Sequence, residues 1–154
     1  MEQSNRMKNK LSLKKLLILG GNPETGVLVQ IANKLGIITI VVDPNPFAPA
    51  KRFSKKHYNI DGFDIPNLII VAKNENIDGV LVGVADILVP PYLQLCEAMG
   101  LPCYATNDII DALSSKDSFT KVCNKFGIEG IPTFNLDENF KVADLNEIGR
   151  ASCR

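Results

Sequence analysis

Residues 15–26 read KLLILGGNPETG, and this stretch decides the fold because an apolar run breaks into a glycine turn. Lys15 to Leu19 is short, continuous and apolar, which is typical of a strand covered on both faces. A turn at residues 20–23 leads into a predicted helix, Thr25 to Leu35, which Gly36 ends. We expect this helix to bury one apolar face, made of Val27, Leu28, Ile31, Ala32 and Leu35. The stretch therefore predicts the opening of a nucleotide-fold-like α/β unit.

The alternation of strand and helix continues along the chain. Further strands are predicted over residues 37–42, 57–60, 79–82 and 101–104, with a last strand candidate at 133–135. Helices are predicted over residues 65–74, 88–99, 107–113 and 118–126, and residues 47–56 form a loop or short helix. This order predicts an α/β protein with an open, Rossmann-like parallel sheet, helices on both faces and a strand order of about 3-2-1-4-5.

Composition excludes several classes of protein. The 154 residues suffice for one domain with a short appendage, and 45% of them are hydrophobic. Because 17 basic residues balance 17 acidic ones, the charge indicates neither nucleic acid nor an anionic membrane as a partner. The sequence offers no segment long enough to span a bilayer. Its four scattered cysteines lack a CxxC pair, which predicts free thiols in a reducing cytoplasm.

The chain divides by composition into a core and two terminal stretches. Residues 1–13 are polar and basic and are expected to be a disordered leader, and residues 14–113 are expected to form the α/β domain. Residues 136–154 are predicted to be a tail, for which a non-native origin is a hypothesis because it ends without an apolar period or a helix cap.

The glycine turn is the first candidate site, through Gly20, Gly21 and Asn22. Backbone amides at such a turn approach anions, and the helix dipole favours negative charge there. The turn does not contain G-x-G-x-x-G, and the spacing from Gly21 to Gly26 resembles a P-loop without its lysine and hydroxyl. Two interpretations stay open: a tight turn whose glycines serve conformation and packing, or a ligand-contacting turn that does not bind a pyrophosphate.

Two aspartates follow predicted strands. Asp43 ends the second strand, where it either contacts a ligand or forms an Asx turn before Pro44. Asp86 follows the fourth strand and either contacts a ligand or caps the next helix. With the strand order 3-2-1-4-5, Gly20, Asp43 and Asp86 face one crevice at the carboxyl edge of the sheet.

A basic cluster follows the second strand. It is interpreted as a solvated face or, alternatively, as a handle for an anionic substrate, and its members are Lys51, Arg52, Lys55 and Lys56. The single histidine, His57, has no acid or nucleophile near it in sequence and is predicted to be an ordinary edge-strand residue.

Several segments, in this order, resemble ATP-grasp ligases. Residues 17–26, 36–46 and 48–50 look like the domain that precedes the ATP-grasp in these enzymes, and DPNPFAPA at 43–50 is similar to the ATPase subunit of phosphoribosylaminoimidazole carboxylase and to carbamoyl-phosphate-synthase-like ligases. Residues 107–117 resemble the connector helix and the lysine at the entry to the ATP-binding domain. Residues 127–133 resemble the Gly-Ile-Pro-x-Pro stretch that follows this entry in the family. The resemblance thus assigns residues 114–135 to the start of an ATP-grasp domain.

The resemblance implies a carboxylate–amine ligase that forms an acyl-phosphate with ATP and Mg²⁺, after which an amine displaces phosphate. It implies a small carboxylate substrate and leaves room for a homodimer. By resemblance, Lys116 reaches the ATP phosphates, the turn at 20–22 lines the substrate crevice, and Asp43 and Asp86 contact substrate. An exposed lysine near a helix start is the alternative interpretation of Lys116.

The resemblance also implies that most of such a ligase lies beyond residue 154. The family's second lysine, adenine-binding strand and magnesium ligands come later, so we expect an N-terminal fragment without activity of its own. The alternative is a stand-alone nucleotide- or metabolite-binding module with a regulatory or docking role. A Rossmann-type oxidoreductase fragment is a weaker third interpretation, because it explains neither the glycine turn nor residues 116–133.

Overall fold

The structure is a computed structural model that describes residues 10–113 and 115–128. The chain divides into two compact units, with the boundary after Asp111, and each unit is described here by itself. Residues 10–13, at the end of the predicted leader, form a helical turn, and the Leu13 amide donates to the carbonyl oxygen of the distant Gly36. The strand candidate at 133–135 lies outside the described residues.

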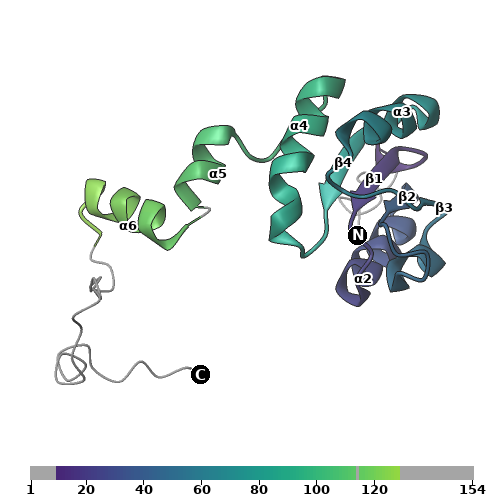
Figure 1. Ribbon diagram of the computed structural model, residues 1–154. Helices are drawn as coiled ribbons and strands as arrows, with labels where there is room; N and C mark the ends of the chain where they lie inside the picture. Colours follow the sequence, from purple (N-terminus) through teal and green to yellow (C-terminus); the bar gives the residue numbers. More distant parts are fainter. Residues whose placement is uncertain (1–9, 114, 129–154) are drawn as a thin grey trace. The chain divides into compact units, whose positions relative to one another are not determined.

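The first unit is built around a parallel sheet of four strands. Along the chain the elements are β1 (Lys15–Leu19), α2 (Pro23–Lys34), β2 (Ile38–Val42), η1 (Pro49–Phe53), β3 (Lys56–Tyr58), α3 (Ile65–Glu75), β4 (Gly79–Val82), η2 (Asp86–Leu88) and α4 (Val89–Met99). Helix α5 (Asn107–Leu113) runs across the boundary. All strand pairs are parallel in the order β3-β2-β1-β4, which confirms the predicted α/β class and the central strand order (Figure 1).

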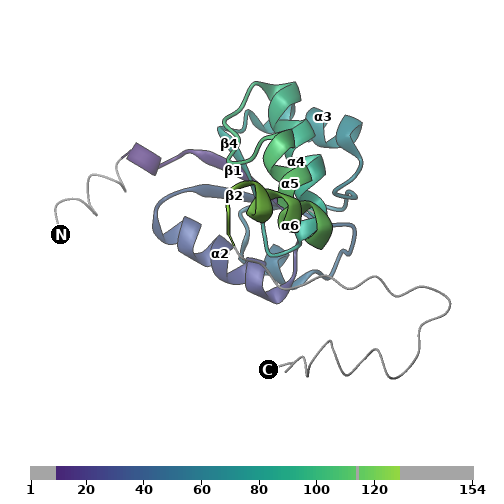
Figure 2. The same ribbon diagram turned by 90° about the vertical axis from the view of Figure 1, so that its left-hand side faces the viewer.

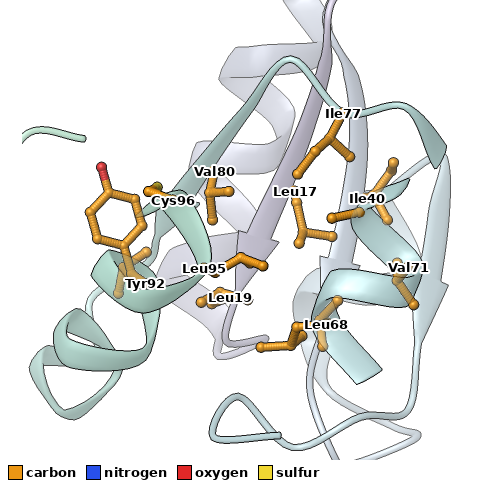
Figure 3. Close-up of a cluster of buried hydrophobic side chains, with 13 residues drawn as sticks. Leu17, Leu19, Ile40, Leu68, Val71, Ile77, Val80, Tyr92, Leu95 and Cys96 are labelled. Carbon is orange, nitrogen blue, oxygen red and sulfur yellow. The ribbon is translucent and has the colours of Figure 1, made fainter. Parts of the chain in front are cut away.

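Helices cover both faces of the sheet, as Figures 1 and 2 show. On one face α3 and α4 bury Leu68 and Leu95 against Leu17 and Leu19 of β1, in the larger core cluster (Figure 3). On the other face α2 packs Val29 in the smaller core cluster, with η1. The central strands are buried on both sides, which explains their continuous apolar runs.

The buried face of α2 differs from the predicted one. Val27 and Ile31 are 55% and 51% exposed, so the prediction that they are buried was wrong. A Cβ added at Gly26 would lie 3.3 Å from the Phe53 ring, which shows that the helix turns its small residues toward η1. The close approach of α2 to η1 therefore decides which face of the helix is buried, and the apolar periodicity does not. The buried residues of α2 are Thr25, Gly26, Val29 and Ala32.

The predicted fifth strand, Leu101 to Tyr104, does not form among the described residues. Its donors are bonded to α4 instead: the Leu101 amide donates to the Cys96 carbonyl oxygen at 2.9 Å, and the Tyr104 amide to Tyr92 Oη at 3.0 Å. Pro102, between them, has no N–H to offer a neighbouring strand. The backbone of this segment therefore completes the end of α4.

The second unit contains α6 (Lys116–Lys125). It begins two residues before the predicted start because Ser115 caps it, with its Oγ accepting from the Ser118 amide at 3.1 Å. Phe119 and Phe126 are exposed in the described part of this unit. Across the described ranges of the chain, no helix has both the length and the apolar character needed to cross a membrane.

The short edge strand β3 is anchored to α3 through the buried Glu75. Its carboxylate accepts from Lys56 Nζ at 2.9 and 2.8 Å and from the Tyr58 hydroxyl. The bond from Lys56, followed by the bond from Tyr58, lowers the pKa of Glu75, and the same bond raises the pKa of Tyr58. The charged carboxylate is therefore the form that holds the edge strand in place.

Replacing Glu75 with glutamine is expected to lower the free energy of unfolding at neutral pH by about 1.5–3 kcal/mol, the range for hydrogen bonds to a charged group. Since the folded pKa lies below the ordinary value of 4.5, the stabilisation is present above that value and is lost as pH falls through the folded pKa. Urea denaturation of the wild type and of Glu75→Gln, at neutral pH and at about pH 3, measures this loss of stabilisation. A difference that stays the same at both pH values would contradict the assignment.

Candidate functional site

A small cavity lies at the carboxyl edge of the sheet, where open α/β folds bind ligands. Its volume is about 270 Å³. Segments that follow all four strands contribute to its walls, and the lining residues are Gly20, Gly21, Asn22, Val42, Asp43, Pro44, Asp61, Gly62, Phe63, Ala85, Ile87 and Leu88. We call this cavity the crevice. Four of the residues predicted from the sequence meet here: Gly20, Gly21, Asn22 and Asp43.

A larger hollow of about 420 Å³ lies beside η1 and β3, with Phe47, Arg52 and His57 among its lining residues. None of the glycines of the turn at 20–22 lines it. The crevice is the stronger candidate site because it lies at the carboxyl ends of the strands, where open α/β sheets bind ligands.

The glycines of the turn serve conformation and packing. Gly20 has a φ of 89°, a conformation that side-chain-bearing residues rarely adopt. A Cβ at Gly21 would lie 2.6 Å from the Cβ of Ala48 and 3.1 Å from Asp43 Oδ2, so no other residue fits without displacement. Gly20 and Gly21 therefore match the interpretation of a tight turn whose glycines serve conformation and packing.

The amides of the turn are already bonded within the protein. The Gly21 amide donates to Asp43 Oδ2 at 2.7 Å, and the Thr25 amide donates to Asn22 Oδ1 at 2.9 Å. Asn22 thereby acts as the N-cap of α2. A phosphate would have to displace the Asp43 carboxylate to reach the Gly21 amide.

Asp43 forms the Asx turn that the sequence left as one alternative. Its Oδ1 accepts from the Asn45 amide at 2.8 Å while its Oδ2 holds Gly21. Asp43 thus joins the segment after β1 to the segment after β2. Its role in the fold is settled by these bonds, and any contact with substrate is an additional role.

Asp86 lies beside the crevice without lining it. It is the exposed first residue of η2, and its two neighbours, Ala85 and Ile87, line the crevice. Of the two alternatives that the sequence left open for Asp86, the helix cap is wrong, because α4 begins after Leu88 and has no side-chain cap. The 3-10 turn at Asp86 separates the aspartate from the helix start.

The predicted basic cluster separates into groups with different roles. Lys51 is only 4% exposed, so its assignment to a solvated face was wrong. Its Nζ donates to the carbonyl oxygens of Asp43 and Asn45, each at 2.7 Å, and to Asn59 Oδ1 at 2.6 Å. Burial lowers the pKa of Lys51, and the nearby charge of Asp43 opposes this shift. Lys56 pairs with Glu75 instead.

Sequence reasoning missed the segment that follows β3. Asp61 Oδ1 accepts from the Phe63 amide at 3.0 Å in a second Asx turn. Gly62 leaves room for Leu88, because a Cβ added at Gly62 would lie 2.6 Å from Leu88 Cδ2. The signal was present in DGFD at residues 61–64, a turn sequence after a strand. Extending the parallel topology to the third strand would have placed it at the same edge.

Lys116 lies in the second unit, as the exposed first residue of α6. This position corresponds to the exposed lysine at a helix start that the sequence left as an alternative. Among the residues that the structure describes, no three His, Cys, Asp or Glu side chains group into a metal site.

Solved structures share this fold. The chain is similar to N5-carboxyaminoimidazole ribonucleotide synthetase from Thermotoga maritima, with a TM-score of 0.66, 23% identity, and coverage of 89% of this chain and 37% of that one. It is similar to N5-carboxyaminoimidazole synthetase from Staphylococcus aureus complexed with ADP, with a TM-score of 0.68, 19% identity, and coverage of 90% and 35%. It is also similar to L-amino acid ligase from Bacillus licheniformis, with a TM-score of 0.65, 16% identity, and coverage of 77% and 31%.

These neighbours are ATP-grasp ligases, and the chain has the fold of their N-terminal part. The resemblance found in the sequence is thereby confirmed at the level of the fold. The chain spans about a third of the length of the structures that it matches. No protein-family model and no curated protein matches it.

Replacing Gly21 with alanine is expected to lower the free energy of unfolding by about 1–3 kcal/mol, because the added methyl group overlaps Ala48. Gly79→Ala is the matched control, since a Cβ there meets only Leu16 Cδ1 at 3.6 Å. Urea denaturation of both variants measures the difference. Equal stability of the two variants would show that the turn has room for a side chain.

Proposed function

We propose that this chain is the N-terminal, substrate-binding portion of an ATP-dependent carboxylate–amine ligase of the ATP-grasp type. The crevice holds part of the substrate. The observation that carries the proposal is the meeting of Gly20, Gly21, Asn22 and Asp43 in one cavity at the carboxyl edge of a sheet with this fold. Nucleotide binding by the whole ligase is supported by the ADP complex of the Staphylococcus aureus enzyme.

The charge of the crevice favours one part of the substrate. Two carboxylates, Asp43 and Asp61, belong to the described lining, and no lysine or arginine does. The buried Lys51 does not line the crevice, and its ammonium group donates to the carbonyl oxygens of Asp43 and Asn45 and to Asn59 Oδ1. Phe63 and Ile87 add apolar surface, with 54% and 69% of each exposed. A group that carries N–H or O–H donors on a small apolar body is complementary to this lining, whereas a carboxylate or phosphate is repelled.

The nucleotide and Mg²⁺ are assigned to the remainder of such a ligase. The Gly21 amide of the turn at 20–22 is already bonded to Asp43, and among the described residues no three His, Cys, Asp or Glu side chains group together. Lys116 keeps its proposed contact with the ATP phosphates, and the chain by itself is inactive. A stand-alone module that binds a small anion is less well supported, because the Gly21 amide that would bind the anion is occupied by Asp43.

The proposal implies a cytoplasmic protein. The described cysteines, Cys96, Cys103 and Cys123, are free thiols, as expected for a reducing compartment.

A pair of aromatic probes of opposite charge tests the crevice. Benzylamine is expected to shift the backbone amide resonances of Gly20, Gly21 and Phe63 in a ¹H–¹⁵N NMR titration of the whole chain, whereas benzoate leaves them in place. Asp61→Asn is expected to weaken benzylamine binding about two- to fivefold, the range for an exposed charge pair. Glu97→Gln, on the exposed part of α4, is the control and leaves binding unchanged.

Shifts caused by benzoate at the same amides would refute the charge preference while keeping the crevice as a binding site. If neither probe shifted these amides, the substrate-binding role of the crevice would be rejected.

Mg-ATP is expected to bind this chain no more tightly than a dissociation constant on the order of 1 mM, because the phosphate site is incomplete. Isothermal titration calorimetry of the chain with Mg-ATP measures this. Micromolar binding would contradict the assignment of the nucleotide site to the remainder of the ligase.

A further inference from the structure

Lys51 is a buried cation with an unusual set of partners. Only 4% of the residue is exposed, and its Nζ lies within 2.6–2.7 Å of three oxygen atoms. An ammonium group has three N–H donors, so every donor is used. The acceptors are two backbone carbonyls and one amide oxygen, none of them a carboxylate. Neutral oxygen atoms therefore hold the ammonium group directly, and the charge of the nearby Asp43 carboxylate adds to this attraction.

The acceptors lie on two segments that each contribute residues to the crevice, and of the three acceptor residues Asp43 lines it directly. Asp43 and Asn45 follow β2, and Asn59 follows β3. Lys51 itself lies in η1, outside the crevice lining. Its ammonium group thus holds the segments after two neighbouring strands at a fixed separation.

A third segment is connected through Asp43. While Lys51 fixes the Asp43 carbonyl oxygen, the Asp43 carboxylate accepts from the amides of Gly21 and Asn45 at 2.7 and 2.8 Å. Gly21 belongs to the turn after β1. A continuous set of hydrogen bonds therefore runs from one buried lysine to the ends of three parallel strands.

We propose that Lys51 is a positioning residue for the crevice: its ammonium group holds the three segments after β1, β2 and β3 in the geometry that receives substrate. The inference rests on the function proposed above, because it takes the crevice as the substrate site. Lys51 makes no contact with substrate in this role. It acts through the carbonyl and the carboxylate of Asp43.

Loss of the ammonium group has a local consequence. Methionine retains an unbranched apolar stem but has no donor, so three oxygen atoms lose their partner. The carbonyls of Asp43 and Asn45 then regain hydrogen bonds only by turning toward water, which moves Asp43 away from the Gly21 amide. The sheet core, which is built from other residues, is not part of this change.

The test compares Lys51→Met with Lys55→Met, the same substitution at an exposed lysine four residues away. Benzylamine binding, followed by NMR in the whole chain, is expected to weaken about tenfold in Lys51→Met, as for the loss of one charged hydrogen bond. Hydrogen exchange of the Gly21 and Asn45 amides is expected to accelerate at least about tenfold relative to amides of α3. Lys55→Met is expected to match the wild type in both measurements.

Two results would overturn the positioning role: unchanged benzylamine binding in Lys51→Met, or exchange that accelerates equally in the crevice and in α3. If Lys51→Met does not fold, Asn59→Ala removes a single acceptor, and the same comparison of Gly21 with α3 decides. Failure of the wild-type chain to bind both benzylamine and benzoate would refute the proposed function. Hydrogen exchange still tests the coupling between Lys51 and Gly21 in that case.

Discussion

The hydrogen bond from the Gly21 amide to the Asp43 carboxylate is the interaction on which the carboxyl edge of this protein depends. It joins the turn after β1 to the turn after β2, and it requires glycine because a side chain at position 21 would overlap Ala48 and Asp43. It also occupies an amide that directly precedes the N-cap of α2, close to the end of the helix whose dipole favours anions. An internal carboxylate therefore already fills this position.

The edge strand β3 shows how a three-residue strand is kept in register. At one side its Lys56 and Tyr58 hold the buried Glu75 of α3, and just beyond its end Asn59 accepts from Lys51. The two anchors are the Glu75 carboxylate and the Lys51 ammonium group, and neither leaves a buried atom without a hydrogen-bond partner. Buried polar groups that are fully bonded specify one arrangement. The strand thus relies on polar anchors at its ends more than on its own apolar residues.

The sequence predicted the parts of the fold that apolar periodicity controls. The bounds of β1 and β4 agree with the predictions, and the order of the central strands is that of the doubly wound α/β pattern which the alternation of strand and helix indicates. The buried face of α2 was not predictable from periodicity, because the close approach at Gly26 decides which side faces the sheet. The burial of Lys51 was equally hidden, since its three acceptors come from positions 43, 45 and 59 and only the folded chain brings them together.

The crevice consequently combines a part that internal hydrogen bonds hold in place and a part that is formed by exposed side chains. The segments after β1 and β2 are fixed by internal hydrogen bonds, so their groups are preorganised and lose little entropy when a ligand binds. The exposed side chains, Phe63 and Ile87, lie on segments that follow β3 and β4. Substitutions there alter the surface that a ligand meets without breaking the bonds around Asp43. Under the proposed function, this division lets the crevice keep its geometry while the residues after β3 and β4 set which substrate fits.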